Sequence, residues 1–160
     1  MNFKRSWVII TLALVTFLGC KPDPAPVSYF MKATINGTLT QFNYPAYADT
    51  ILGSSYTSTV ISGTLGGSDH VFTFTFRSNS QALLVPGTYT GTNTYILSVT
   101  LVKGSLSKFY TNQGSNFTVT VQTVNNTYAE GTFSGTLKET SNSADILTIT
   151  DGTFKCAFIH

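Results

Sequence analysis

Hydrophobic and polar residues alternate along most of the chain beyond position 27. In residues 70–77, three phenylalanines (Phe72, Phe74 and Phe76) fall on one side and two threonines and an arginine on the other. Residues 95–101, 117–122, 133–137 and 154–158 follow the same period of two. This period, in segments rich in Thr, Val, Phe and Tyr, is typical of β-strands with one buried face. Residues 47–55 and 78–87 have room for one helical turn at most.

Turn signals separate these segments. Asn36-Gly37 lies between two apolar-polar runs, which is the strongest short signal for a β-hairpin. Further signals lie at 66–69, 86–87, 103–104, 112–114, 125–126 and 151–152. Successive signals begin 9 to 30 residues apart, and four of the six intervals are 20 residues or shorter. This rhythm predicts an all-β fold, an antiparallel β-sandwich or partly open barrel of about nine to ten strands.

The first twenty residues have a different pattern. Lys4 and Arg5 precede an uncharged, mostly apolar run from Trp7 to Leu18, which is twelve residues long (18 − 7 + 1). A membrane-spanning helix needs roughly 20 residues. A short basic stretch, an apolar run of this length and a small residue at its end are typical of a secretory signal peptide.

A cysteine marks the end of this run. Residues 17–20, Phe-Leu-Gly-Cys, resemble a bacterial lipobox, in which a lipid is attached to the cysteine and the chain is cut just before it. The resemblance implies a signal peptide over 1–19, a lipidated Cys20 opening a proline-rich tether over 20–27, and a single β domain over 28–160. The alternative is an ordinary signal peptide followed by an unrelated cysteine.

Removal of the signal peptide changes the charge. The chain has nine basic and seven acidic residues, and the loss of Lys4 and Arg5 leaves seven of each (9 − 2 = 7). A formally neutral protein lacks the basic surface that nucleic-acid binding requires, so no nucleic acid is expected among its partners.

The mature part resembles a group of small, uncharacterised Bacteroidota lipoproteins. The resemblance rests on the early Ile-Asn-Gly at 35–37, the central Gly-Thr-Tyr at 87–89, and the late Gly-Thr-Phe at 131–133 and 152–154. Phe42 stands near the place where such proteins often have tryptophan. The resemblance implies an all-β lipoprotein and brings no activity or catalytic residue.

Candidate catalytic and metal-binding groups are few. His70 and His160 are the only histidines, and neither has a partner at the spacing of a zinc site. Asp69-His70 is interpreted as a solvated pair in a turn. Glu130 and Glu139 could form a glycosidase pair, although pairs are easy to draw among seven scattered acids, and the functional alternative is a small hydrolase that uses Asp69 or Glu130. Asp145 and Asp151 flank a predicted strand, where a weak calcium site has no further support. No cofactor or metal is therefore expected.

Cys156 and Thr50 are two further candidate residues. With Cys20 lipidated, Cys156 has no intramolecular partner, and its phase with Phe154 and Phe158 predicts a small core residue rather than a reactive thiol. Asp49-Thr50-Ile51 matches the short O-glycosylation pattern of Bacteroidota, which makes Thr50 a candidate acceptor.

The predicted function is that of a non-enzymatic binding or structural lipoprotein of the outer membrane, with the leaflet and the oligomeric state left open. Its partners are the membrane, through the anchor, and a glycan or an envelope protein. The alternative is a carbohydrate-binding accessory module, because tyrosines near predicted loops suit sugar recognition. The competing interpretation is that these tyrosines cover the edges of the core. They are Tyr44, Tyr47, Tyr56, Tyr89, Tyr110 and Tyr128.

Overall fold

The computed structural model describes residues 27–43, 46–65, 70–90, 95–104, 108–113 and 116–159. Cys20, Tyr44, Asp69 and His160 lie outside these ranges, as does the predicted signal peptide. Eleven strands occupy the described residues, and none of these residues is helical. In particular, this part of the chain contains no helix with the length and apolar character needed to cross a membrane.

The all-β prediction is confirmed, with eleven strands rather than nine or ten. The sequence pattern did not single out β6 and β8, which are only three and four residues long and therefore too short to show a clear alternation. The strands are β1 Phe30–Ile35, β2 Thr38–Gln41, β3 Ala46–Leu52, β4 Thr57–Thr64, β5 Val71–Ser78, β6 Gly87–Tyr89, β7 Tyr95–Lys103, β8 Lys108–Thr111, β9 Phe117–Val124, β10 Tyr128–Glu139 and β11 Ile146–Phe158.

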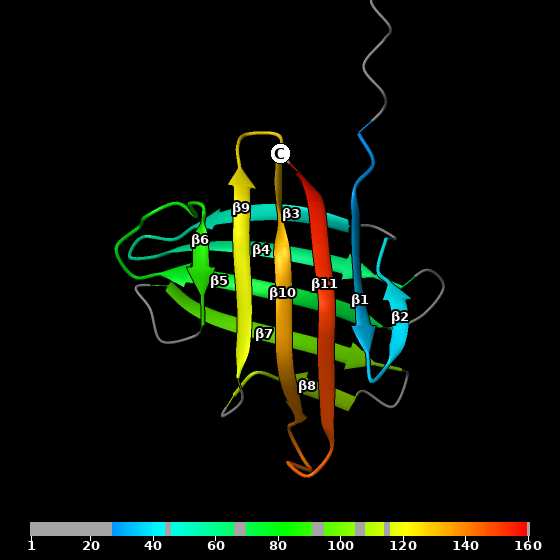
Figure 1. Cartoon of the computed structure of the whole chain (residues 1–160). Helices are drawn as coiled ribbons and strands as arrows, with labels where there is room; N and C mark the ends of the chain where they lie inside the picture. Colours follow the sequence, from blue (N-terminus) through cyan, green and yellow to red (C-terminus); the bar gives the residue numbers. More distant parts are fainter. Residues whose placement is uncertain are drawn as a thin grey trace, which may run out of the picture.

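Pairing joins all eleven strands into one sheet that closes on itself as a ring, and we call the two sides of this ring layers. One layer has the order β2-β1-β11-β10-β9-β6, and the other has the order β3-β4-β5-β7-β8. The layers join where β11 pairs with β3 in parallel and where β10 pairs with β8 antiparallel. Figure 1 shows β1, β11, β10 and β9 running crosswise over β3, β4, β5 and β7.

The two joints depend on the length of β10 and β11. One edge of β11 pairs with β1 up to Lys155 and then with β3 through Ala157 and Phe158. One edge of β10 pairs with β9 up to Gly135 and then with β8 through Lys138 and Glu139. Each long strand therefore belongs to both layers, and the two strands pair with one another along almost their whole length.

A bulge lies in the middle of this long pair. The register of β10 and β11 shifts between Phe133 and Gly135, and Asp151 has a positive φ of 52°. The predicted turn at Asp151-Gly152 is therefore wrong, because this dipeptide is a bulge inside β11. Aspartate tolerates the left-handed region better than most residues, which explains why the same dipeptide suits a turn or a bulge.

The predicted hairpin at Asn36-Gly37 is confirmed. Both residues have positive φ, 48° and 82°, as a two-residue type I′ turn requires. The Asn36 side chain also accepts a hydrogen bond from the backbone N–H of Thr148 at 2.8 Å, and its own backbone N–H donates to the Thr148 carbonyl at 2.9 Å. These bonds attach the hairpin to β11.

The core lies between the layers and is rich in phenylalanine. Phe74 and Phe133 have ring centroids 4.7 Å apart, and Phe72 contacts both rings. The predicted inner faces of β5, β7, β9, β10 and β11 are confirmed, apart from Phe158, which is only half-buried. Their buried members are Phe72, Phe74, Phe76, Leu97, Val99, Leu101, Phe117, Val119, Val121, Phe133, Leu137, Phe154 and Cys156.

Glycines make room for these rings where the strands cross the core. A Cβ added at Gly152 would overlap both the carbonyl oxygen and the ring of Phe133. A Cβ added at Gly131 would likewise overlap the ring of Phe154 and the carbonyl oxygen of Thr120. Only the absence of a side chain lets the phenylalanine lie flat against the neighbouring strand.

We expect Gly152→Ala to destabilise the fold by about 2–3 kcal/mol, because backbone and ring must both shift to admit a methyl group. The control is Gly87→Ala, where the nearest atom is 3.8 Å from an added Cβ. That change should alter the free energy of unfolding by less than about 0.5 kcal/mol. Urea denaturation of the two variants measures the difference, and equal stabilities would contradict the packing described.

Candidate functional site

Glu130 and Glu139, considered above as a glycosidase pair, lie far apart in the structure. Glu130 and Glu139 both lie on β10, nine residues apart, which corresponds to about 30 Å along a strand. A glycosidase pair needs about 5–10 Å. Glu130 instead forms an ion pair with Lys155 at 3.2 Å, on the outer face of the sheet.

The proposed calcium pair is separated too. Asp145 precedes β11 and Asp151 lies at its bulge, about 20 Å further along the strand. Within the described ranges, no three His, Cys, Asp or Glu side chains gather as metal ligands would. His70 lines a hollow discussed below, whereas its neighbour Asp69 lies outside the described residues.

Cys156 is fully buried and its thiol contacts the Phe30 carbonyl oxygen at 3.8 Å. Burial raises the pKa of the thiol to about 12. A thiol that stays protonated at neutral pH is a poor nucleophile. The prediction of a small core residue is confirmed.

The tyrosines fall into two groups. Tyr89 and Tyr110 are buried, and their hydroxyls donate to the Val85 carbonyl and to the Asp145 carboxylate. These two cover the edges of the core. Tyr47, Tyr56 and Tyr128 are half-buried, and the last two lie under the cations of Arg77 and Lys155.

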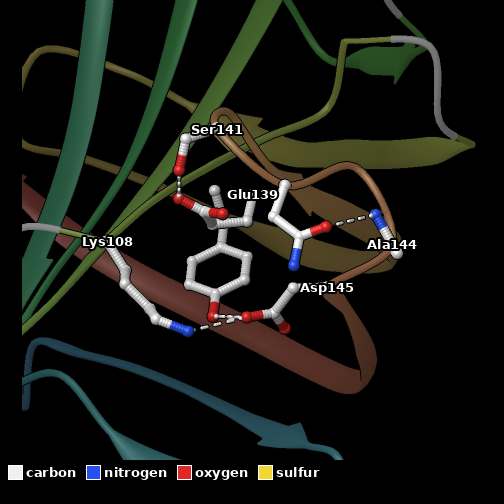
Figure 2. A network of polar contacts seen from close by, with 7 residues as sticks. Lys108, Glu139, Ser141, Ala144 and Asp145 are labelled. Carbon is white, nitrogen blue, oxygen red and sulfur yellow. Dashed lines mark hydrogen bonds and ion pairs between the residues drawn. The ribbon is translucent and has the colours of Figure 1, made fainter.

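A polar network surrounds the joint between β8 and β10 (Figure 2). Asp145 accepts hydrogen bonds from Lys108 Nζ and from the Tyr110 hydroxyl, both at 2.9 Å. In the same turn Ser141 Oγ donates to the buried carboxylate of Glu139 at 2.6 Å. The Thr140 N–H donates to the Phe109 carbonyl at 2.8 Å. The network therefore ties the β10–β11 turn to β8 and closes this corner of the ring.

The groups of this network shift one another's pKa values. The hydrogen bond from Lys108, and after it that from Tyr110, holds the pKa of Asp145 below its ordinary value of 3.8. The bond to Asp145 raises the pKa of Lys108, and burial followed by the bond to Asp145 raises the pKa of Tyr110. All three groups thus favour the fold in their neutral-pH forms, a charged pair and a protonated phenol.

The outer face of the β1-β11-β10-β9-β6 layer carries a shallow trough. Register places four threonines side by side across four strands: Thr88, Thr120, Thr132 and Thr153. The Thr88 and Thr120 hydroxyl oxygens are 3.2 Å apart. Because the bulge lowers the surface at Gly152, the row borders a hollow of about 380 Å³. We call this surface the threonine trough; it is lined by Thr118, Thr120, Thr132, Phe133, Ser134, Asp151, Gly152 and Thr153.

The Thr153 hydroxyl in this trough is inaccessible to solvent and has no hydrogen-bond partner among the described residues. Sequence reasoning placed threonines on outer faces, but it did not find the row. The alternation within each strand indicates on which face of the sheet a threonine lies. Only the pairing of strands far apart in the chain aligns the four threonines.

Two hollows open at the edges between the layers. The first, which we call the end hollow, measures about 310 Å³ and is lined by Thr50, Thr59, Leu83, Leu84, Val124, Asn125, Asn126 and Phe158. The second measures about 320 Å³ and is lined by Ile35, Asn36, Thr38, Thr40, Phe42, Leu65, His70, Leu101 and Lys103. The end hollow is uncharged, whereas Lys103 lines the second.

The candidate glycosylation residue lies in the end hollow. Thr50 is half-buried on β3, and its hydroxyl oxygen is 3.4 Å from that of Thr59 on β4. Its backbone N–H donates to the Asp49 carboxylate at 2.7 Å. Glycosylation of Thr50 stays a prediction, and the geometry adds that a sugar on this oxygen would have to pass through the hollow.

Comparison of the chain with protein-family models, with curated proteins and with solved structures gave no match. The resemblance to Bacteroidota lipoproteins therefore stays a prediction from the sequence.

We expect Asp145→Asn to reduce stability near neutral pH and to weaken the acid sensitivity of the fold. A carboxyl with a lowered pKa stabilises the folded state above its unfolded pKa, ordinarily 3.8, and this contribution disappears as the pH falls through the folded pKa. The free energy of unfolding of wild type should thus exceed that of the variant at pH 6, and this difference should shrink in acid.

Urea unfolding at a series of pH values tests this expectation. The control is Asp151→Asn, an exposed acid whose replacement also tolerates the left-handed region. If the difference between wild type and Asp145→Asn is the same at every pH, the network does not contribute through this carboxylate.

Proposed function

We propose that the protein is a lipid-anchored lipoprotein of the outer membrane in the Bacteroidota, whose β domain binds a ligand or serves as a structural module without catalysis. The observation that carries the proposal is Cys20, which stands at the end of a signal-like apolar run and ahead of a proline-rich tether. Two or three acyl chains on such a residue would hold the protein firmly, whereas one chain gives marginal binding.

The arrangement of polar groups supports a non-catalytic role. The carboxylates on β10 are too far apart to cooperate, and the buried thiol has a pKa near 12. The best-connected polar group, around Asp145, joins β8 to the β10–β11 turn. Its hydrogen bonds serve the closure of the ring, which is a structural task.

We further infer that the fold is a β-sandwich with crosswise layers rather than a partly open barrel. The support is that each layer has its own continuous strand order and that the layers meet at only two corners, through β11–β3 and β10–β8. In such packings, long strands that bend at bulges pass from one layer to the other. The bulge at Asp151 lies in one of these two strands.

The anchor is tested by labelling cells with radioactive palmitate. We expect wild type to take up the label and Cys20→Ala to lose it, because the sulfur of Cys20 is the attachment point. Protease added to intact cells then reports the leaflet: digestion indicates an exposed domain, and protection a periplasmic one. Absence of label from wild type would contradict the proposal and leave a secreted or periplasmic domain.

Carbohydrate binding is a second candidate, and the threonine trough is the observation that favours it. Each hydroxyl both donates and accepts hydrogen bonds, as sugar hydroxyls do. Thr132 lies at the centre of the row, and the half-buried Tyr128 lies on the same strand. The trough is open along the sheet, which suits an extended chain better than a small enclosed ligand.

A glycan array with a matched pair of variants tests this candidate. We expect Thr132→Val to lose at least half of any bound glycan, because valine keeps the shape and removes the hydroxyl. Thr75→Val, on the outer face of the other layer, should leave binding unchanged. No binding by wild type at millimolar sugar, or an equal loss in both variants, would count against the trough.

A further inference from the structure

One end of the domain differs from the rest of its surface. The described chain begins at Val27 and enters β1 at Phe30, which pairs with Lys155 near the carboxyl end of β11. The carboxyl ends of β9 and β11 and the start of β10 lie at this same end (Figure 1). We call it the tether end, because the proline-rich residues 20–26 directly precede Val27.

Exposed apolar side chains gather at the tether end. Six of the ten large exposed apolar side chains of the described residues belong to segments that meet there. They are Val27, Ile51, Leu52, Leu83, Val85 and Ile159, between 49% and 73% exposed.

Contacts hold these segments together. The Ile159 N–H donates to the Ala48 carbonyl at 2.9 Å, which joins the chain end to β3. Gln81 Nε2 donates to the Ser54 carbonyl at 2.7 Å, which joins the 79–86 loop to the turn after β3. Leu83 reaches the end hollow beside Val124 and Phe158. These contacts connect the chain end, β3, the turn after it and the 79–86 loop, whereas Val27 precedes β1, which pairs with the carboxyl end of β11.

Few charged residues lie at this end, and two that border it, Arg77 and Lys155, cover the rings of Tyr56 and Tyr128. The segments that form it, residues 27–29, 46–56, 79–86, 124–128 and 156–159, contain Asp49 as their only charged residue. The β8–β10 corner has four charged residues in β8, the end of β10 and the turn after it, and the end of β7 adds a fifth: Lys108, Lys138, Glu139, Asp145 and Lys103. Charged groups resist transfer from water into a bilayer, whereas apolar groups favour it. The tether end is thus suited to contact with lipid, and the opposite corner is not.

The tether is short compared with the domain. Seven residue steps separate Cys20 from Val27, and they span at most about 25 Å when fully extended. The thirteen residues of β11 alone span about 43 Å. A lipid on Cys20 would therefore keep the tether end close to the bilayer surface.

We propose that the tether end is a membrane-docking surface, whose exposed apolar side chains, Leu83 among them, enter the interface of the bilayer that holds the anchor. This inference rests on the proposed lipidation of Cys20. Docking would supply a second attachment besides the acyl chains and would fix the orientation of the domain. The β8–β10 corner would then point away from the membrane, and the threonine trough would face sideways.

A fluorescent probe at Leu83 tests the docking. The protein is the full lipidated chain, reconstituted into vesicles of phosphatidylethanolamine and phosphatidylglycerol that contain nitroxide-labelled lipid. Leu83→Cys is labelled with a polarity-sensitive thiol dye. Because Cys20 would carry the anchor and Cys156 is buried, the dye should react at the new cysteine alone. Val85→Cys gives a second position in the same loop.

Leu39→Cys is the matched control. Leu39 is 62% exposed and Leu83 is 61% exposed, but Leu39 lies on β2 after the Asn36-Gly37 turn, away from the start of β1. We expect the nitroxide lipid to quench the dye at Leu83 at least about threefold more than the dye at Leu39, with a blue-shifted emission at Leu83 only.

The other outcomes separate the two proposals. If the protein floats with the vesicles but both dyes are quenched equally, the anchor stands and the docking surface is refuted. If the Leu83 dye is blue-shifted without quenching by the labelled lipid, a second copy or another protein covers this end, which also refutes docking on lipid. If the protein does not float with the vesicles, the lipid anchor itself fails, and the inference fails with it.

Discussion

The pairing of β10 with β11 is the interaction on which the rest of the structure depends. These two strands are paired over residues 128–138 and 146–157, and each carries neighbours from both layers. Their inner faces supply Phe133 and Phe154 to the core. The ring of Phe133 lies against Gly152 on the neighbouring strand, and that of Phe154 lies against Gly131. Loss of this pair would open both corners and expose the phenylalanine cluster.

The geometry of this pair also separates the two ends of the molecule. The turn between β10 and β11 meets β8 and carries the network around Asp145. The other ends of the same strands carry the Glu130–Lys155 ion pair and meet β3 and the 79–86 loop, two segments in which Asp49 is the only charged residue. A single long hairpin thus connects the corner around Asp145 to the end at which Leu83 and Ile159 are exposed, and the proposed docking on lipid rests on this difference.

The chemistry of the candidate site follows from the same sheet. Strand pairing separates Glu130 from Glu139 and aligns the threonines of four strands, so the broadest polar feature of this layer is a row of hydroxyls. Hydroxyls in a shallow trough form hydrogen bonds but supply neither a nucleophile nor a proton at neutral pH. These hydroxyls are the observation on which the proposal of carbohydrate binding rests.

The sequence by itself determined the local features. The period of two placed Phe72, Phe74, Val119 and Cys156 inside, and Asn36-Gly37 specified a hairpin, because side-chain direction and turn conformation depend on neighbouring residues alone. The lipobox-like Cys20 likewise needs no fold to be recognised.

Only the tertiary structure decided which strands are neighbours. It turned Asp151-Gly152 from a predicted turn into a bulge, added the short strands β6 and β8, and brought Leu83 beside Phe158. Pairing between segments far apart in the chain depends on how all the buried faces fit together. The alternation within one strand contains no information on that fit.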